Sequence, residues 1–300
     1  MEMIKTIYYA LVPLLVLLGA IFIACLVGYF VALGIGDQFT INKIIHKLAQ
    51  LFLVLSIFPA MAYFKFKKTD IGFAGKAVFL KQLLQGFGLG FVTLMPVVIV
   101  LYGLGVNVID QSQGWTVSLL VKKMTLSLLL ALIVSWIEEP LFRGILLTGL
   151  KRKMSVITAV IISAIYYAML HFLDSDTNIS YQDLTLLSGF KLLGEAFANL
   201  LNPDILSAFW ALVMVGIFLG VLRTEFKASL GLCIGCHTSW VWQIKMSKSL
   251  FNTNFSSEYL YLVNRYYDGL IGPLVTGWLS LAILGYLVYR QINKPAFINP

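Results

Sequence analysis

Ser135-Trp-Ile-Glu-Glu-Pro-Leu-Phe-Arg-Gly144 places two adjacent carboxylates and an arginine inside a stretch that is otherwise apolar. No other charged residue lies between Lys123 and Lys151. At about 1.5 Å per residue, a helix through this window would carry Glu138 roughly 20 Å from each end. An ionised carboxylate at such a depth in a bilayer is costly unless it is paired or lines a wet cavity. The stretch is therefore a candidate functional site.

The composition predicts an all-α, polytopic membrane protein. Of 300 residues, 59% are apolar and 12% are charged, whereas soluble domains carry roughly 25% charged residues. Eight apolar runs approach the roughly 20 residues that a transmembrane helix needs. They are 6–36, 48–64, 82–109, 124–150, 154–173, 205–222, 228–244 and 269–289. Because no repeat or low-complexity tract interrupts them, we expect a single membrane domain over residues 1–300, with a polar site in the interior of the helix bundle.

The net charge of +8 comes from short clusters of lysine and arginine between the apolar runs. No basic stripe or base-stacking platform accompanies these clusters, so a nucleic-acid partner is not expected.

If the eight spans alternate, thirteen basic residues fall on the side of the N-terminus and eight on the other side. The positive-inside rule then predicts that both termini are cytoplasmic. The absence of targeting signals favours a bacterial inner membrane.

Two longer polar segments, 174–204 and 245–268, interrupt the apolar runs. Both have amphipathic character, and the second is rich in tyrosine, which is typical of the headgroup level of a membrane. We expect them to lie in the interface as lids or half-helices.

The three cysteines, at 25, 233 and 236, lie in apolar runs, so no disulfide framework is expected. Cys233-Ile-Gly-Cys-His237 matches the pattern of covalent haem attachment. However, this pattern lies inside the charge-free run 228–244, out of reach of an attachment machinery outside the membrane. Its small residues instead favour close packing between helices.

The spacing of the three central charges separates their roles. Glu139 and Arg143 stand four residues apart, in the favourable order for an ion pair on one helix face, whereas Glu138 and Arg143 do not align. We therefore expect Glu138 to lack a local counter-charge and to be free to exchange protons with a substrate. Pro140 removes a backbone donor, which predicts a kink in the helix. A purely structural role, in which the charges only hold helices together, stays open.

Two histidines lie in other apolar runs. His171 ends the fifth run and His237 lies in the seventh. A single histidine in such a run is more often a packing residue, but two of them together with an intramembrane acid pair indicate a convergent site.

These residues carry a resemblance to a known family. Glu138-Glu-Pro-Leu-Phe-Arg143 resembles the E-E-x-x-x-R motif of the CAAX prenyl protease and bacteriocin-processing family of intramembrane glutamic proteases. Tyr167-Ala-Met-Leu-His171 resembles the second motif of that family, and His237 heads a third. The resemblance covers the chain from about 124 to 244.

The resemblance implies a role for each of these residues. Glu138 would be the general base and His171 its partner in activating a water that attacks a peptide carbonyl, and His237 would stabilise the oxyanion. Glu139, Arg143 and Tyr167 would support them. The substrate would be a membrane-associated peptide or a lipidated protein in contact with the lipid bilayer, and no cofactor is implied.

One position departs from the family pattern. The family commonly has Asn or Asp four residues after the third-motif histidine, where this chain has Val241. A valine cannot donate a hydrogen bond, so a second oxyanion donor would have to come from elsewhere, with Ser239 and Trp240 as candidates.

Two alternatives to a glutamic protease stay open. One is a zinc-dependent membrane hydrolase, although the H-E-x-x-H spacing is absent. The other is a non-catalytic partner-binding or immunity protein of the same family.

Overall fold

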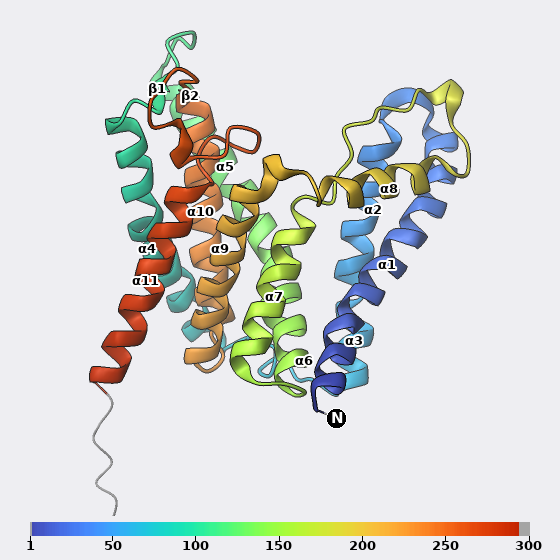
Figure 1. The fold of residues 1–300 in the computed structure, drawn as a ribbon, viewed down its shortest axis with the longest axis horizontal. Coiled ribbons are helices and arrows are strands. Elements are labelled where there is room, and N and C mark those ends of the chain that lie inside the picture. The colour runs from blue at the N-terminus through green and yellow to red at the C-terminus, as the bar shows by residue number, and fades with distance from the viewer. Residues whose placement is uncertain (1, 294–300) are drawn as a thin grey trace, which may run out of the picture.

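The computed structural model describes residues 2–293, which form a bundle of long helices (Figure 1). The helices are α1 (Glu2–Ile35), α2 (Ile41–Leu55), α3 (Ile57–Phe64), α4 (Lys76–Gly103), α5 (Val117–Glu139), α6 (Leu147–Lys151), α7 (Val156–Leu170), α8 (Ser188–Asn199), α9 (Leu206–Glu225), α10 (Leu230–Leu250) and α11 (Pro273–Ile292). A π-helical segment, Pro140–Leu146, joins α5 to α6. Short 3-10 turns occur at Gly36–Gln38, Tyr181–Asp183, Pro203–Ile205 and Leu260–Leu262.

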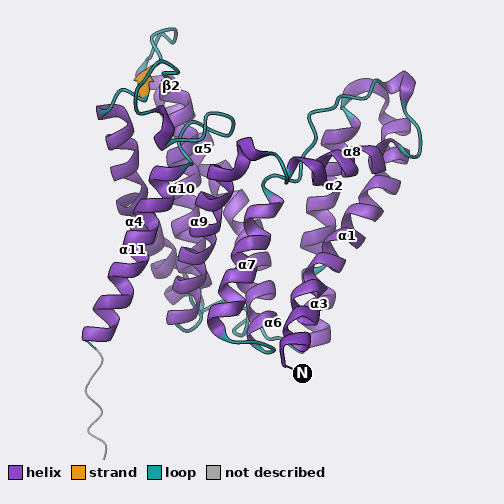
Figure 2. Cartoon of the chain, viewed as in Figure 1, coloured by secondary structure: helices purple, strands orange, loops and turns teal. Residues whose placement is uncertain are grey.

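Strand structure within the described residues is limited to one small antiparallel pair, β1 (Asn107–Ile109) and β2 (Phe251–Thr253). It joins the loop after α4 to the loop after α10 at the end of the bundle opposite the N-terminus (Figure 2). The chain is thus an all-α, polytopic integral membrane protein, as predicted.

Within residues 2–293, six helical stretches are long and apolar enough to cross a membrane. They are Thr6–Gln38, Ile41–Phe64, Lys76–Gly103, Val117–Lys151, Pro203–Glu225 and Pro273–Ile292. The helices α7 and α10, which also correspond to predicted spans, are not among them, because α7 has only 15 residues and α10 carries polar side chains along its 21 residues. The predicted count of eight spans therefore stays a prediction for these two.

The interior position of α10 explains how it tolerates polar residues. Most of its length is buried by its neighbours, above all α4, α5 and α9. Its contact with α4 uses glycines on both helices. A side chain at Gly86 of α4 would collide with the carbonyl oxygen of Leu232, and one at Gly235 of α10 would collide with that of Leu83. The prediction of close packing by the small residues of the seventh run is confirmed.

The helices α1, α2, α3 and α8 stand beside the rest of the bundle (Figure 1). A separate apolar cluster holds α1, α2 and α8 together, whereas the main core joins α4, α7, α9, α10 and α11. The amphipathic helix α8 lies in the predicted polar segment 174–204. The other predicted segment, 245–268, holds no separate α-helix, because its first six residues continue α10 and the rest forms β2 and turns.

Candidate active site

The central motif lies where the α5 helix changes its winding. The α-helix ends at Glu139, and Pro140 begins the π-helical segment. Proline has no backbone N–H and crowds the preceding turn, so regular α-helical hydrogen bonding cannot continue through it. π-Helical turns of this kind are frequent at functional sites. The Ser163 hydroxyl on α7 donates to the carbonyl oxygen of Phe142 at 3.3 Å, so a backbone group of this segment is satisfied by a neighbouring helix.

Glu139 lies fully buried in the wall of the site. The guanidinium of Arg143 lies 3.3 Å from its Oε1, and these side chains are 1% and 0% exposed. This is the ion pair that the four-residue spacing predicts, and the prediction is confirmed. The Nδ1 of His237 also donates to the same oxygen, at 2.8 Å. Sequence spacing could not reveal this second contact, because 98 residues separate the two side chains.

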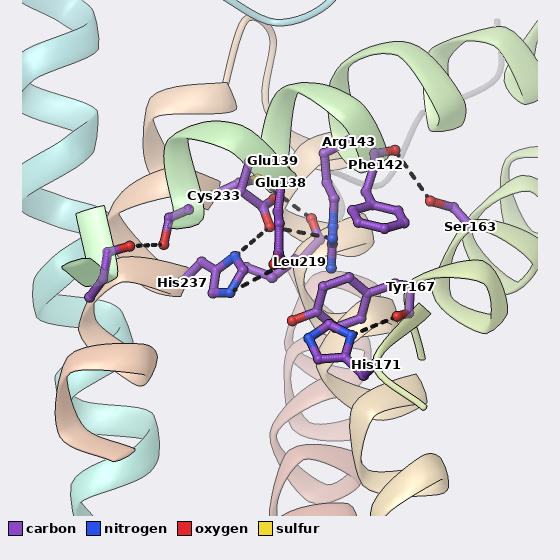
Figure 3. A network of polar contacts seen from close by, with 12 residues as sticks. Glu138, Glu139, Phe142, Arg143, Ser163, Tyr167, His171, Leu219, Cys233 and His237 are labelled. Carbon is purple, nitrogen blue, oxygen red and sulfur yellow. Dashed lines mark hydrogen bonds and ion pairs between the residues drawn. The ribbon is translucent and has the colours of Figure 1, made fainter. Parts of the chain in front are cut away.

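Glu138 has a different environment, since 24% of its side chain is exposed. Its Oε2 lies 3.8 Å from the Nε2 of His237, so the imidazole lies between the two neighbouring carboxylates (Figure 3). Arg143 forms an ion pair with Glu139 and none with Glu138 among the described residues. The expectation that Glu138 lacks a counter-charge on its own helix is therefore met.

His171 follows the last turn of α7. Its Nδ1 lies 2.8 Å from the carbonyl oxygen of Tyr167. Because a carbonyl can only accept, Nδ1 carries the proton, which leaves Nε2 of the neutral ring as an acceptor. The Tyr167 ring lies between the guanidinium of Arg143 and the ring of His171, at 4.5 Å from each (Figure 3). The Tyr167 ring thus contacts both the Glu139–Arg143 ion pair, through Arg143, and His171.

A cavity of about 350 Å³ connects these residues. Glu138 on α5, His171 after α7 and His237 on α10 all line it, together with Tyr167. The structure therefore brings the three predicted catalytic residues to a single cavity, and Glu139 and Arg143 lie behind its wall.

The far end of the cavity is formed by charged and phenolic groups that the sequence did not single out, namely Lys245, Lys248, Tyr267 and Asp268. Burial raises the pKa of the Asp268 carboxyl and that of the Tyr267 hydroxyl above their ordinary values. Both residues lie in the loop before α11. The cavity therefore runs from the acid pair toward the end of the bundle that carries β2.

Val241 lines the cavity one turn after His237 and offers no donor there. Neither of the two substitutes suggested by the sequence provides one. The indole N–H of Trp240 donates to the hydroxyl of Thr93 at 2.9 Å, and Ser239 packs against Gly90 of α4 outside the cavity lining. The hydroxyl of Tyr167, in contrast, forms no hydrogen bond with the described residues.

A zinc hydrolase would need several His, Cys, Asp or Glu side chains that converge on one point. Among the described residues, no three His, Cys, Asp or Glu side chains converge so that they could hold a metal ion. Glu139 already forms an ion pair with Arg143 and a hydrogen bond with His237. The cysteines of the haem-like pattern are free and buried, and the thiol of Cys233 donates to the carbonyl of Leu219.

Comparison with known proteins agrees with the three motifs. Residues 120–243 match a family model described as Type II CAAX prenyl endopeptidase Rce1-like. No curated protein and no solved structure matches the chain. The matched segment contains Glu138, His171 and His237, and its family is one of CAAX-type intramembrane proteases. Residues 120–243 are therefore similar to the Rce1-like family of type II CAAX prenyl endopeptidases.

Proposed function

We propose that this protein is an intramembrane endopeptidase that hydrolyses a peptide bond in a membrane-associated or lipid-modified peptide by means of a glutamate- and histidine-activated water. One observation carries the proposal. Glu138, His171 and His237 come from three separate parts of the chain and line the same cavity, while the neighbouring carboxylate of Glu139 is neutralised in its wall.

In this proposal Glu138 is the general base. It takes a proton from a water whose oxygen attacks the carbonyl carbon of the substrate, and His171 accepts a hydrogen bond from that water through Nε2. When the tetrahedral intermediate collapses, the C–N bond breaks and Glu138 returns its proton to the leaving nitrogen. Glu138 thus ends the cycle in the same protonation state in which it began, and the reaction needs no cofactor.

His237 would stabilise the oxyanion from its Nε2. That atom can donate only if the ring is an imidazolium, because Nδ1 already donates to Glu139. The carboxylate of Glu139 at Nδ1 fixes the orientation of the ring. Tyr167 would supply the second donor that Val241 lacks, since its free hydroxyl belongs to a ring that lines the cavity next to His237. Tyrosine hydroxyls serve this purpose in other oxyanion sites.

The proposed location is a bacterial inner membrane, with both termini in the cytoplasm, as the distribution of basic residues favours. The proposed partners are a peptide or lipidated protein substrate and the surrounding lipid. The apolar part of the cavity lining, which includes Leu94, Val97, Leu212 and Ile271, suits an apolar peptide segment.

The experiment that tests the function compares membrane peptides from cells producing the wild type, Glu138→Gln or the control variant Glu225→Gln. Glu225 pairs with Arg290 in another part of the bundle. Cleaved peptides should appear with the wild type and with the control and should be absent with Glu138→Gln, provided that all three proteins are present in equal amounts. Identical peptide sets from the wild type and Glu138→Gln would contradict the proposal.

A second candidate function, partner binding without cleavage, is favoured by one observation, the valine at position 241 in the cavity wall. In that case a bound membrane protein would copurify equally with the wild type and with Glu138→Gln, and no cleaved product would form. A zinc hydrolase would be recognised by loss of cleavage in o-phenanthroline, which should leave a glutamic protease active.

A further inference from the structure

Two lysines extend the catalytic face of α10 into the far end of the cavity. Lys245 and Lys248 follow His237 by eight and eleven residues, and all three line the cavity together with Val241. Residues with this spacing lie along one side of an α-helix. The cavity thus has an acid and histidine end and a lysine end, connected by one helix face.

The two lysine ammonium groups are unpaired within the described part of the chain, although the charge of Lys248 partly offsets the effect of burial on the pKa of the nearby Asp268 carboxyl. Neither forms an ion pair or a side-chain hydrogen bond with the described residues, although Asp268 lines the same part of the cavity. The Oδ1 of Asp268 instead accepts the backbone N–H groups of Leu270 and Ile271, at 3.0 and 2.7 Å. Lysines near a helix end often simply extend toward the membrane interface. Here both also line the cavity that holds Glu138, with Lys245 half-buried and Lys248 exposed.

The spacing along α10 sets the distance between the two ends. At about 1.5 Å per residue, Lys245 lies about 12 Å and Lys248 about 16 Å along the helix from His237. An extended peptide advances roughly 3.3–3.6 Å per residue. A peptide with its scissile carbonyl at His237 would therefore bring an anionic group to the lysines about three to five residues farther along.

The lysine end faces away from the basic side of the bundle. At the end that holds the N-terminus and the loop before α4, the described side chains include eleven basic and two acidic groups, whereas the opposite end has eight basic and nine acidic groups. The first set is Lys65, Lys67, Lys68, Lys76, Lys81, Lys151, Arg152, Lys153, Arg223, Lys227 and Arg290, with Asp70 and Glu225. The second set is Lys43, Lys47, Lys122, Lys123, Lys191, Lys245, Lys248 and Arg265, with Asp37, Asp110, Asp174, Asp176, Asp183, Glu195, Asp204, Glu258 and Asp268.

We propose that Lys245 and Lys248 form an anion subsite, which binds a carboxylate of the peptide substrate a few residues from the scissile bond and opens on the side of the membrane opposite the basic loops. The carboxylate is either the free C-terminus of the peptide or an acidic side chain. This inference rests on the proposed protease function, because the subsite is defined relative to the bond that Glu138 would cleave.

The test uses one membrane peptide that the wild type cleaves or that copurifies with the Glu138→Gln protein. It is synthesised in three forms: with a free C-terminal carboxylate, with a C-terminal amide, and as the amide with an added aspartate at the same end. The purified proteins are the wild type, the double variants Lys245→Gln/Lys248→Gln and Lys245→Arg/Lys248→Arg, and Lys122→Gln, which removes an exposed lysine that does not line the cavity. The readout is the ratio of kcat/KM between the charged peptides and the amide.

We expect the wild type to prefer a charged peptide over the amide by about tenfold, the factor that corresponds to roughly 1.4 kcal/mol. The preference should disappear in the Gln double variant and persist in the Arg double variant and in Lys122→Gln. A preference for the free C-terminus alone identifies the terminal carboxylate as the ligand, and equal preference for both charged forms identifies any carboxylate. No charge preference in the wild type, or the same preference in the Gln double variant, would overturn the subsite.

A binding measurement separates this proposal from the protease function. Fluorescence anisotropy with labelled peptides and the Glu138→Gln protein reports the charge preference without cleavage. If no peptide is cleaved by the wild type but the charged forms still bind more tightly in a lysine-dependent manner, the subsite stands and the protease function fails. If the wild type cleaves the peptide but binding does not depend on the lysines, the protease function stands and the subsite fails.

Discussion

Tyr167 connects most of the polar groups of the site. Its ring contacts the Arg143 guanidinium and the His171 imidazole, and its carbonyl fixes the tautomer of His171. Its hydroxyl is the part that is left without a partner among the described residues. Because Val241 offers no hydrogen-bond donor, we assign the hydroxyl of Tyr167 to the oxyanion.

The variant Tyr167→Phe tests this assignment, since phenylalanine keeps the ring contacts and removes only the hydroxyl. Loss of one oxyanion donor typically lowers kcat by about 10²–10³-fold. We expect a loss of this size in Tyr167→Phe with little change in KM, measured on a cleaved membrane peptide. The matched control is Tyr166→Phe, whose hydroxyl donates to the Ala10 carbonyl of α1 instead.

Adding a donor at position 241 should restore part of the lost rate. In the double variant Tyr167→Phe/Val241→Asn, the new amide would lie one turn from His237 in the cavity lining. Recovery of kcat supports an oxyanion role, which a merely structural tyrosine would not show. Full activity in Tyr167→Phe alone would exclude the hydroxyl from the reaction.

At this scale the sequence predicts local contacts and misses distant ones. The Glu139–Arg143 pair follows from four-residue spacing on one helix, whereas the bond from His237 to Glu139 depends on how α5 and α10 pack. The hydrogen bond from the indole N–H of Trp240 to the hydroxyl of Thr93 likewise could not be predicted, because the two residues lie 147 positions apart.

The contact between α4 and α10 sets the position of His237. Gly86 and Gly90 on α4 pack against the backbone of α10, and Gly231 and Gly235 on α10 pack against that of α4. The contacts are so close that added side chains would collide with backbone atoms. Small residues with this spacing allow two helix backbones to approach closely in a membrane. The position of His237 relative to α5 therefore depends on glycines that take no part in the chemistry.

Gly235→Ala should destabilise this contact. The new methyl group would collide with the backbone of α4 at Leu83, and overpacking of this kind typically costs about 1–3 kcal/mol. We expect a lower midpoint of thermal unfolding in detergent and reduced cleavage. Gly88→Ala is the control, because no atom lies within 4 Å of a side chain added there. Equal unfolding midpoints for the two variants would contradict the packing account.

The helices themselves were largely predictable, since long apolar runs demand helical backbone in lipid. The predicted run 124–150 corresponds to α5, the π-helical segment and α6, but Pro140 alone predicted only a kink and not the π-helical winding. The β1–β2 pair was not predicted, because three-residue strands whose partners are far apart in sequence leave no periodic pattern.

On the scale of the whole molecule, charge is distributed unequally between the two ends of the bundle. The end with the N-terminus carries a large excess of basic groups, and the end with β1 and β2 carries nearly balanced charges. The positive-inside rule therefore favours a cytoplasmic location for the basic end. The lysine end of the cavity would then open on the other side of the membrane.

Single cysteines at the two ends test this orientation. Thr69→Cys lies in the exposed loop before α4, and Gln111→Cys lies in the exposed loop after β1. In a chain whose native cysteines are buried, a membrane-impermeant maleimide added to intact cells should label Gln111→Cys, and Thr69→Cys only after permeabilisation. The reverse pattern would invert the membrane orientation and place the cavity opening in the cytoplasm.

The convergence of Glu138, His171 and His237 is an arrangement of the whole bundle, which the family resemblance implied and spacing within the chain could not establish. Three distant parts of the sequence meet only after α5, α7 and α10 have packed. The polar far end of the cavity could not be foreseen, because Lys245 and Lys248 resemble ordinary lysines at a helix end.

The rate at which purified Glu138→Gln protein cleaves a membrane peptide that the wild type cleaves tests the central claim most directly. Because glutamine cannot accept the proton of the attacking water, we expect the rate to fall by about 10²–10⁴-fold while the peptide still binds. An unchanged rate for Glu138→Gln would contradict the account, since the carboxylate that faces the cavity would then take no part in the reaction.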